Sequence, residues 1–166
     1  MTRNPRVVVG IDLSLAGLQA LRFAVAEARR RGTSLRAIRA WQFGPAWYGL
    51  DVGPQAAGLA DEAAMTIVTA FQQAMGGVPS DIMVDAQAVE GPAATVLVDQ
   101  ASGVDDLLVV GRSGRHLPGS PRVDVRCLRT ASCPVVAVPA PVASGVAALR
   151  RDVVSEAEAL LRSSAD

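Results

Sequence analysis

Short apolar runs alternate with segments of helical periodicity along most of this chain, and that alternation restricts the fold more than any other feature. Residues 6–11 and 106–110 are almost continuously apolar, which is typical of strands buried on both faces. Further strands are predicted at residues 35–41, 82–88 and 134–138. Five strands alternating with helices indicate an α/β domain, in which a parallel sheet carries helices on both faces.

The segments between the predicted strands carry helix signals. Ser14 is placed to cap a helix that ends at Gly32, and within it Glu27 faces Arg31 one turn away. Proline in a first turn marks two further helix starts, because its missing N–H costs nothing there. Three more helices are therefore predicted, over residues 59–75, from residues 91–92 onward, and from Ser120-Pro121 to about residue 130.

The last part of the chain departs from this alternation. A proline-containing stretch, residues 139–145, precedes apolar residues at helical spacing over residues 146–162, which predicts an appended C-terminal helix. We divide the chain into an α/β domain over residues 1–139 and a linker with an amphipathic helix over residues 140–166. The apolar face of that helix needs a partner surface, either on its own domain or on a second subunit.

Composition excludes several classes of function. The 166 residues carry 16 basic and 16 acidic side chains, so no excess positive charge favours nucleic acid or a membrane surface. The basic residues are all arginine, which excludes a Walker-type loop, a Schiff base and a receiver domain. The first apolar run is too short for a signal peptide, and prolines interrupt the longest uncharged stretch. We expect a cytoplasmic protein.

The chain has few residues for metal or nucleophilic chemistry. Cys127, Cys133 and the single His116 cannot complete a four-ligand zinc site, and we expect both cysteines to be reduced and buried. A hydrolase triad can be drawn from the serine of residues 111–114 (GRSG), His116 and Asp124. Three triad members within one loop can hardly reach the separated positions that the geometry needs. We interpret His116 as an exposed loop residue.

Two loops stand out as a candidate ligand site. In open parallel sheets, ligands bind beyond the carboxyl ends of the strands, where the strand order reverses. With an order of 3-2-1-4-5, the loop at residues 10–14 faces the loop at residues 111–120. The second loop has three glycines and leads into a predicted helix, a combination that favours an anion but also serves a plain turn.

Four segments, in this order, resemble the universal stress protein family. They are VVVGIDLS at residues 7–14, EARRRG at residues 27–32, LLVVGRSG at residues 107–114 and CPVVAVP at residues 133–139. The resemblance implies a five-stranded sheet of order 3-2-1-4-5 and a homodimer. In one branch of the family it also implies ATP or AMP binding without a general enzymatic role.

The resemblance also implies individual site residues. Nucleotide-binding members carry an aspartate after the first strand, matched here by Asp12, which would bond to adenosine; its alternative role is to cap the following turn. Members contact adenine through backbone groups near the end of the second strand, here Ala40 or Trp41. Their phosphate loop reads G-x-x-G, nine residues, then G followed by S or T, and Gly111 and Gly114 match its first half.

The second half of that phosphate loop departs from the family pattern, because the pair Gly119 and Ser120 follows after only four residues. Two outcomes are open. Either this pair still offers donors to a phosphate, with Arg112 and Arg115 adding positive charge, or the shorter, proline-stiffened loop closes the pocket.

An aromatic group follows the second predicted strand. Trp41, Trp47 and Tyr48 lie within eight positions, where they could roof an adenine, form a partner surface or pack within their own loop.

We therefore predict a dimeric regulatory module that binds ATP or AMP, with Mg²⁺ held by the phosphates, and that has no catalytic residues. The alternative is a nucleotide-free dimeric interaction or scaffold protein on the same fold. Weak ATP hydrolysis is the least favoured, because only Asp12 and His116 offer a base near the loop. The predicted binding residues are Asp12, Ala40, Gly111, Arg112, Gly114, Arg115, Gly119 and Ser120. An edge strand at residues 135–138 is the predicted partner surface.

Overall fold

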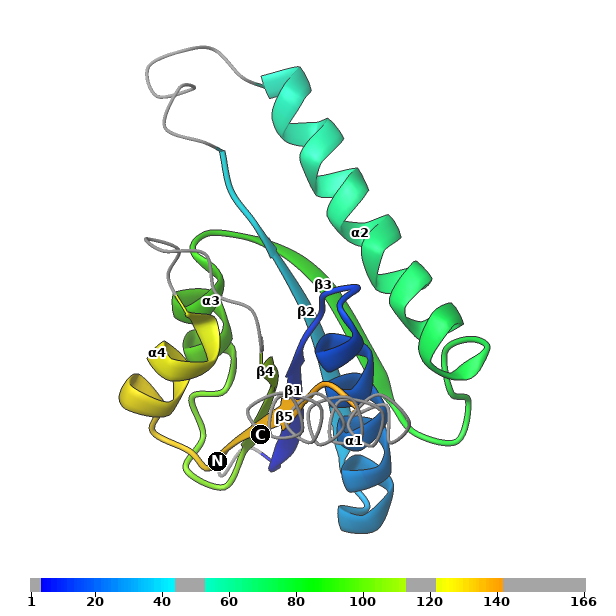
Figure 1. The fold of residues 1–166 in the computed structure, drawn as a ribbon, viewed down its shortest axis with the longest axis vertical. Helices are drawn as coiled ribbons and strands as arrows, with labels where there is room; N and C mark the ends of the chain where they lie inside the picture. Colours follow the sequence, from blue (N-terminus) through cyan, green and yellow to red (C-terminus); the bar gives the residue numbers. More distant parts are fainter. Residues whose placement is uncertain (1–3, 44–52, 113–121, 142–166) are drawn as a thin grey trace, which may run out of the picture.

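The structure, a computed structural model, describes residues 4–43, 53–112 and 122–141. Its elements follow in the order β1 (Arg6–Gly10), α1 (Leu15–Arg31), β2 (Ser34–Trp41), α2 (Gly53–Met75), β3 (Val84–Glu90), α3 (Ala93–Gln100), β4 (Leu107–Arg112), α4 (Val123–Thr130) and β5 (Val135–Pro139). The five strands form one parallel sheet of order β3-β2-β1-β4-β5 (Figure 1). The predicted fold class and strand order are confirmed.

Two hydrophobic cores lie on opposite faces of the sheet. Side chains alternate along the central strand β1, so that Val7 and Val9 belong to one core and Val8 to the other. Helices α1 and α2 cover the first face and α3 and α4 the second (Figure 1). Burial of each large aliphatic side chain stabilises the fold by about 1.5–3 kcal/mol, and the two cores together fix the helices against the sheet.

Helix α1 has the ends that the sequence predicts. The Ser14 hydroxyl accepts a hydrogen bond from the Gly17 N–H at 3.0 Å, and Gly32 ends the helix in the left-handed conformation at φ 63°. Glu27 pairs with Arg31 as predicted and also with Arg30, each at 2.6 Å. The start of α1 is therefore fixed beside the carboxyl end of β1.

Two helix starts were predicted wrongly. Helix α2 begins at Gly53 and not near residue 59. Its first residues, GPQAAG, were not predicted as helix because glycine and proline are typical of a loop. Proline is compatible with a first turn, so Pro54 does not prevent this start. Helix α4 begins at Val123 after an extended Arg122, so Ser120 and Pro121 do not open it.

The two cysteines are free and buried, as predicted. Burial raises the pKa of the Cys127 thiol to about 11 and raises that of Cys133 as well, so both remain protonated thiols at neutral pH. Within the described ranges, no helix combines the length and the apolar character needed to cross a bilayer. The predicted C-terminal helix, residues 146–162, and His116 lie outside the described residues.

Candidate functional site

A cavity of about 140 Å³ lies at the carboxyl ends of β1, β2 and β4. Because β1 has β2 and β4 as its neighbours, three predicted site residues from distant parts of the sequence meet there: Asp12, Ala40 and Gly111. The predicted crevice between β1 and β4 therefore exists among the described residues. The cavity is lined by Gly10, Ile11, Asp12, Ile38, Arg39, Ala40, Ala93, Leu97, Val110, Gly111 and Val123.

Asp12 caps the turn after β1, which is one of the two roles that the sequence leaves open for it. Its Oδ1 accepts a hydrogen bond from the Ser14 N–H at 2.7 Å, which closes the turn into α1. The same side chain lines the cavity. A carboxylate has about four acceptor positions, so one backbone hydrogen bond leaves Asp12 with capacity for hydroxyl groups of a ligand.

Glycine at position 111 is required by packing, whatever ligand binds. A Cβ there would lie 2.7 Å from the Gly17 backbone nitrogen and 2.9 Å from the Ala16 carbonyl carbon. At Gly17, in turn, a Cβ would lie 2.6 Å from the Asp12 carbonyl oxygen. The first turn of α1 thus lies directly against the ends of β1 and β4, a contact that only these small residues permit.

Of the other predicted binding residues, Arg112 alone lies in the part of the chain that the structure describes. Arg112 ends β4 with an exposed side chain and does not line the cavity. Gly114, Arg115, Gly119 and Ser120, which would complete a phosphate loop, lie outside the described residues, as do Trp47 and Tyr48. The structure thus brings Asp12 and Ala40, predicted near the nucleoside, together with Gly111, the first glycine of the predicted phosphate loop. The remaining phosphate residues stay predictions.

Arg39 is a residue of this site that sequence reasoning missed. It lies on β2, and its Nη1 donates a hydrogen bond to the Ile11 carbonyl oxygen at 3.0 Å, directly before Asp12. A charged residue near the end of a mostly apolar strand was the available signal, since residues 35–41 read LRAIRAW. Arg39 links the ends of β1 and β2 and places a cation at the cavity.

A second cavity, of about 350 Å³, adjoins the first along the same edge of the sheet. The two cavities share Arg39, Ala40 and Ala93. Trp41 is part of the wall of the second cavity. Its indole ring contacts the Phe43 ring edge-on, with 5.7 Å between the ring centroids. The remaining lining residues are Gln42, Leu59, Glu62, Ala63, Thr66 and Gly91.

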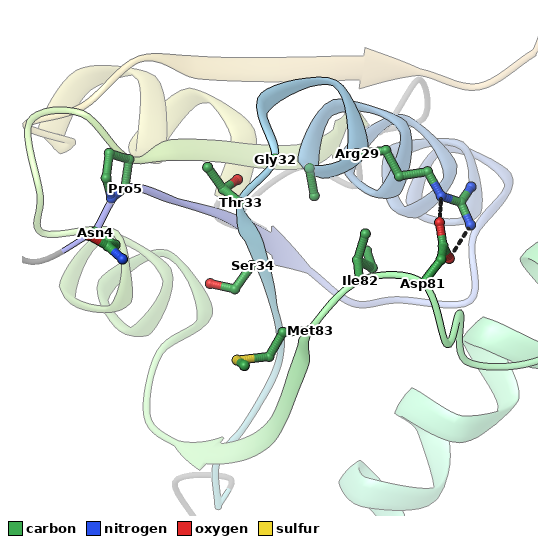
Figure 2. Close-up of a pocket in the computed structure, with 10 residues that line it drawn as sticks. Asn4, Pro5, Arg29, Gly32, Thr33, Ser34, Asp81, Ile82 and Met83 are labelled. Atoms are coloured by element: carbon green, nitrogen blue, oxygen red, sulfur yellow. Dashed lines mark hydrogen bonds and ion pairs between the residues drawn. The ribbon is translucent and has the colours of Figure 1, made fainter.

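A larger hollow, of about 830 Å³, lies at the opposite edge, by the amino ends of the strands. Figure 2 shows Arg29 and Asp81 on its wall, joined by two hydrogen bonds of 2.6 and 2.8 Å. The Arg29 guanidinium lowers the pKa of Asp81 through these bonds. This charge pair is already satisfied, and the hollow lies away from the edge where parallel sheets bind ligands.

Asp124, the aspartate of the hydrolase triad considered from the sequence, forms an ion pair. Asp124, at the start of α4, pairs with Arg122 at 2.8 Å. Burial alone would raise its pKa, but the hydrogen bonds from Arg122 and from backbone N–H groups outweigh that effect and lower it. Asp124 therefore serves its own helix start. Among the described residues, no group of three or more His, Cys, Asp or Glu side chains is arranged to hold a metal ion.

Comparison with known protein families identifies one family that matches most of the chain. The sequence profile of the universal stress protein family matches residues 3–139. No curated protein matches the chain.

Solved structures resemble the fold over most of its length. Universal stress protein UspA from Lactobacillus plantarum is 20% identical with a TM-score of 0.62, and the match covers 83% of this chain and 99% of that one. A universal stress protein in complex with cAMP is 24% identical with a TM-score of 0.54, covering 84% and 100%. A family protein from Arabidopsis thaliana with AMP bound is 18% identical with a TM-score of 0.54, covering 84% and 94%.

Proposed function

The chain belongs to the universal stress protein family, and from that premise we propose that it is a regulatory module that binds ATP or AMP at the carboxyl ends of β1, β2 and β4. One observation carries this proposal: Asp12, Ala40 and Gly111 line a single cavity where the strand order reverses. The related structures that hold cAMP and AMP support an adenine nucleotide as the ligand class.

Each residue has a role that its chemistry suits. The Asp12 carboxylate accepts hydrogen bonds from the ribose hydroxyls, and backbone groups at Ala40 contact the adenine. Gly111 begins the turn toward the phosphates, where Arg112 adds positive charge. In this proposal the loop that follows supplies further phosphate contacts from Gly114, Arg115, Gly119 and Ser120, with Mg²⁺ held by the phosphates. No residue is assigned a catalytic role.

We propose that the module is a cytoplasmic homodimer, with residues 1–139 as the binding domain and residues 140–166 as a linker and helix. The support is strand β5, an edge strand whose apolar residues Val135 to Val138 are all only half-buried. Light scattering coupled to gel filtration tests this part, and a monomer at micromolar concentration would contradict it.

A thermal-shift titration with ATP and AMP, with and without Mg²⁺, tests the nucleotide site. Binding at a concentration 100 times the Kd adds about 2.7 kcal/mol to stability, so we expect a melting temperature several degrees higher. Asp12→Asn should weaken binding roughly tenfold, because a neutral amide is a poorer acceptor than a carboxylate. An asparagine retains an oxygen for the Ser14 N–H, so the fold should persist.

Asp81→Asn, at the opposite edge of the sheet, is the matched control and should leave nucleotide binding unchanged. No shift at millimolar nucleotide would reject the proposal and favour the alternative, a nucleotide-free interaction protein. Inorganic phosphate released over hours, measured with the same samples, would contradict the assignment as a binding module.

A further inference from the structure

The cavity at Asp12 and Gly111 is too small for a whole nucleotide. Its volume is about 140 Å³, whereas small-molecule sites usually span ~300–1,000 Å³. The adjoining cavity of about 350 Å³ shares Arg39, Ala40 and Ala93 with it. A ligand with its ribose at Asp12 therefore extends toward α2 if it is to bury its base.

The second cavity suits a flat heterocycle. Small apolar side chains, Ala40, Ala63 and Ala93, form part of its wall, and Trp41 contributes an aromatic side chain. Two polar side chains, Glu62 and Thr66, come from α2, which begins on the carboxyl side of the sheet and runs toward its amino edge (Figure 1). An apolar wall with a few placed polar groups is the usual form of a site for an aromatic ring.

We propose that the base lies in this second cavity and that Glu62 on α2 selects a base with an exocyclic amine at carbon 6. This inference rests on the proposed function and assigns a specificity residue to it. An ionised carboxylate only accepts hydrogen bonds. It pairs with the amine of adenine, and it opposes the carbonyl oxygen that hypoxanthine carries at the same position.

The surroundings of Glu62 leave its carboxylate available for this contact. The side chain is exposed on α2 and lines the cavity, and among the described residues it forms no ion pair. Thr66, one turn along, lines the same cavity, and its hydroxyl donates to the Glu62 carbonyl oxygen at 2.9 Å. The nearby cation, Arg39, donates to the Ile11 carbonyl oxygen. Through Glu62, α2 therefore supplies the cavity with a carboxylate that can accept a hydrogen bond.

The test compares AMP with IMP, which differs from AMP at carbon 6 of the base, by titration calorimetry on the full chain. The wild type should bind AMP about tenfold more tightly than IMP, as one specific base contact provides. Glu62→Gln should reduce that ratio to about threefold or less, because an amide donates to the IMP oxygen as readily as it accepts from the AMP amine. Asp61→Asn is the control: Asp61 is also exposed on α2 but does not line the cavity, so the ratio should stay at its wild-type value.

The outcomes separate this inference from the proposed function. If AMP binds and Glu62→Gln leaves the AMP-to-IMP ratio unchanged, the role of Glu62 is overturned while the nucleotide site stands. If Asp61→Asn changes the ratio equally, a general charge effect replaces the specific contact and the role of Glu62 is again overturned. If neither nucleotide binds to the wild type, the proposed function fails and the inference fails with it.

Discussion

The two edges of the sheet use their polar groups differently. The amino edge has a hollow of about 830 Å³, yet charged side chains at this edge are engaged with one another, as in Arg29 with Asp81 and Arg36 with Asp85, at 2.6 Å each. At the carboxyl edge the cavities are smaller, and within the described residues Asp12 bonds to a backbone N–H and forms no ion pair. The larger hollow thus lies at the edge where charged side chains are already paired.

The direction of the chain explains this difference. In a parallel sheet with helical connections, helices begin at the carboxyl edge and end at the amino edge, so free N–H groups collect at the first and carbonyl groups at the second. Helix α1 ends in Arg29, Arg30 and Arg31, which suit the negative end of the helix dipole. Ion pairs thus stabilise the amino edge, while helices with free N–H groups begin at the carboxyl edge.

The largest test of this contrast removes a buried charge from the amino edge. Asp106, only 1% exposed, accepts hydrogen bonds from the backbone N–H groups of Arg6 at 3.1 Å and Gly103 at 3.0 Å, and its carboxylate lies 3.9 Å from the Arg6 Nε. Asp106→Ala should reduce the free energy of unfolding by about 3–5 kcal/mol, because it removes a buried carboxylate that accepts two backbone hydrogen bonds and pairs with Arg6. Urea denaturation measures this loss.

The neighbouring Asp105→Ala is the control, since Asp105 is exposed and its loss should change stability little. Nucleotide affinity of the folded Asp106→Ala protein should equal that of the wild type. A large drop in affinity would show that the two edges are coupled and would break the contrast between them.

A smaller loss of stability should follow from crowding the carboxyl edge. In Gly17→Ala, the new Cβ would lie 2.6 Å from the Asp12 carbonyl oxygen, so the first turn of α1 has to move away from β1. Overpacking of this kind costs about 1–3 kcal/mol. Because the new Cβ also crowds the Asp12 carboxylate, nucleotide binding should fall as well, which thermal shift would detect in parallel with urea denaturation.

Gly58→Ala provides the comparison for that variant. Gly58 is also helical, in α2, and a Cβ there meets nothing within 4 Å. Alanine should stabilise α2 by up to about 1 kcal/mol, because it restricts the unfolded chain and favours helix. Equal destabilisation by both substitutions would show that close packing at Gly17 is not the cause of the loss of stability.

The sequence predicts the layers of this fold well because periodicity depends on local burial. Strand order came from the family resemblance, and Ser14 and Gly32 marked the ends of α1 correctly. The start of α2 was missed because glycine and proline dominate its first residues, while tertiary position decides their conformation. Local signals alone cannot settle such a boundary.

The candidate site was predictable only in part. Asp12 follows a buried strand, so its position at the carboxyl edge could be inferred. The hydrogen bond from Arg39 to Ile11 could not be inferred in this way. It depends on the pairing of Gly10 with Ile38, which brings Arg39, the next residue of β2, beside Ile11. Glu62 was missed for the same reason: nothing in the sequence of α2 shows which of its acidic residues lines a cavity.

The smallest expected effect belongs to Arg29, at the exposed ion pair of the amino edge. In the wild type, hydrogen bonds from Arg29 hold the pKa of Asp81 below its ordinary value of 3.8. A lowered carboxyl pKa contributes stability above the unfolded pKa, and this contribution is lost as the pH falls from about 4 through the folded value. Both side chains are about half exposed, at 49% and 54%, so solvent screens most of the interaction. Arg29→Ala should therefore lower the melting temperature by about 2 °C or less at pH 7, and the difference from wild type should shrink as the pH falls below about 4. The AMP affinity of this variant should equal that of the wild type. A loss of AMP binding would mean that the large hollow beside Arg29 takes part in ligand binding after all.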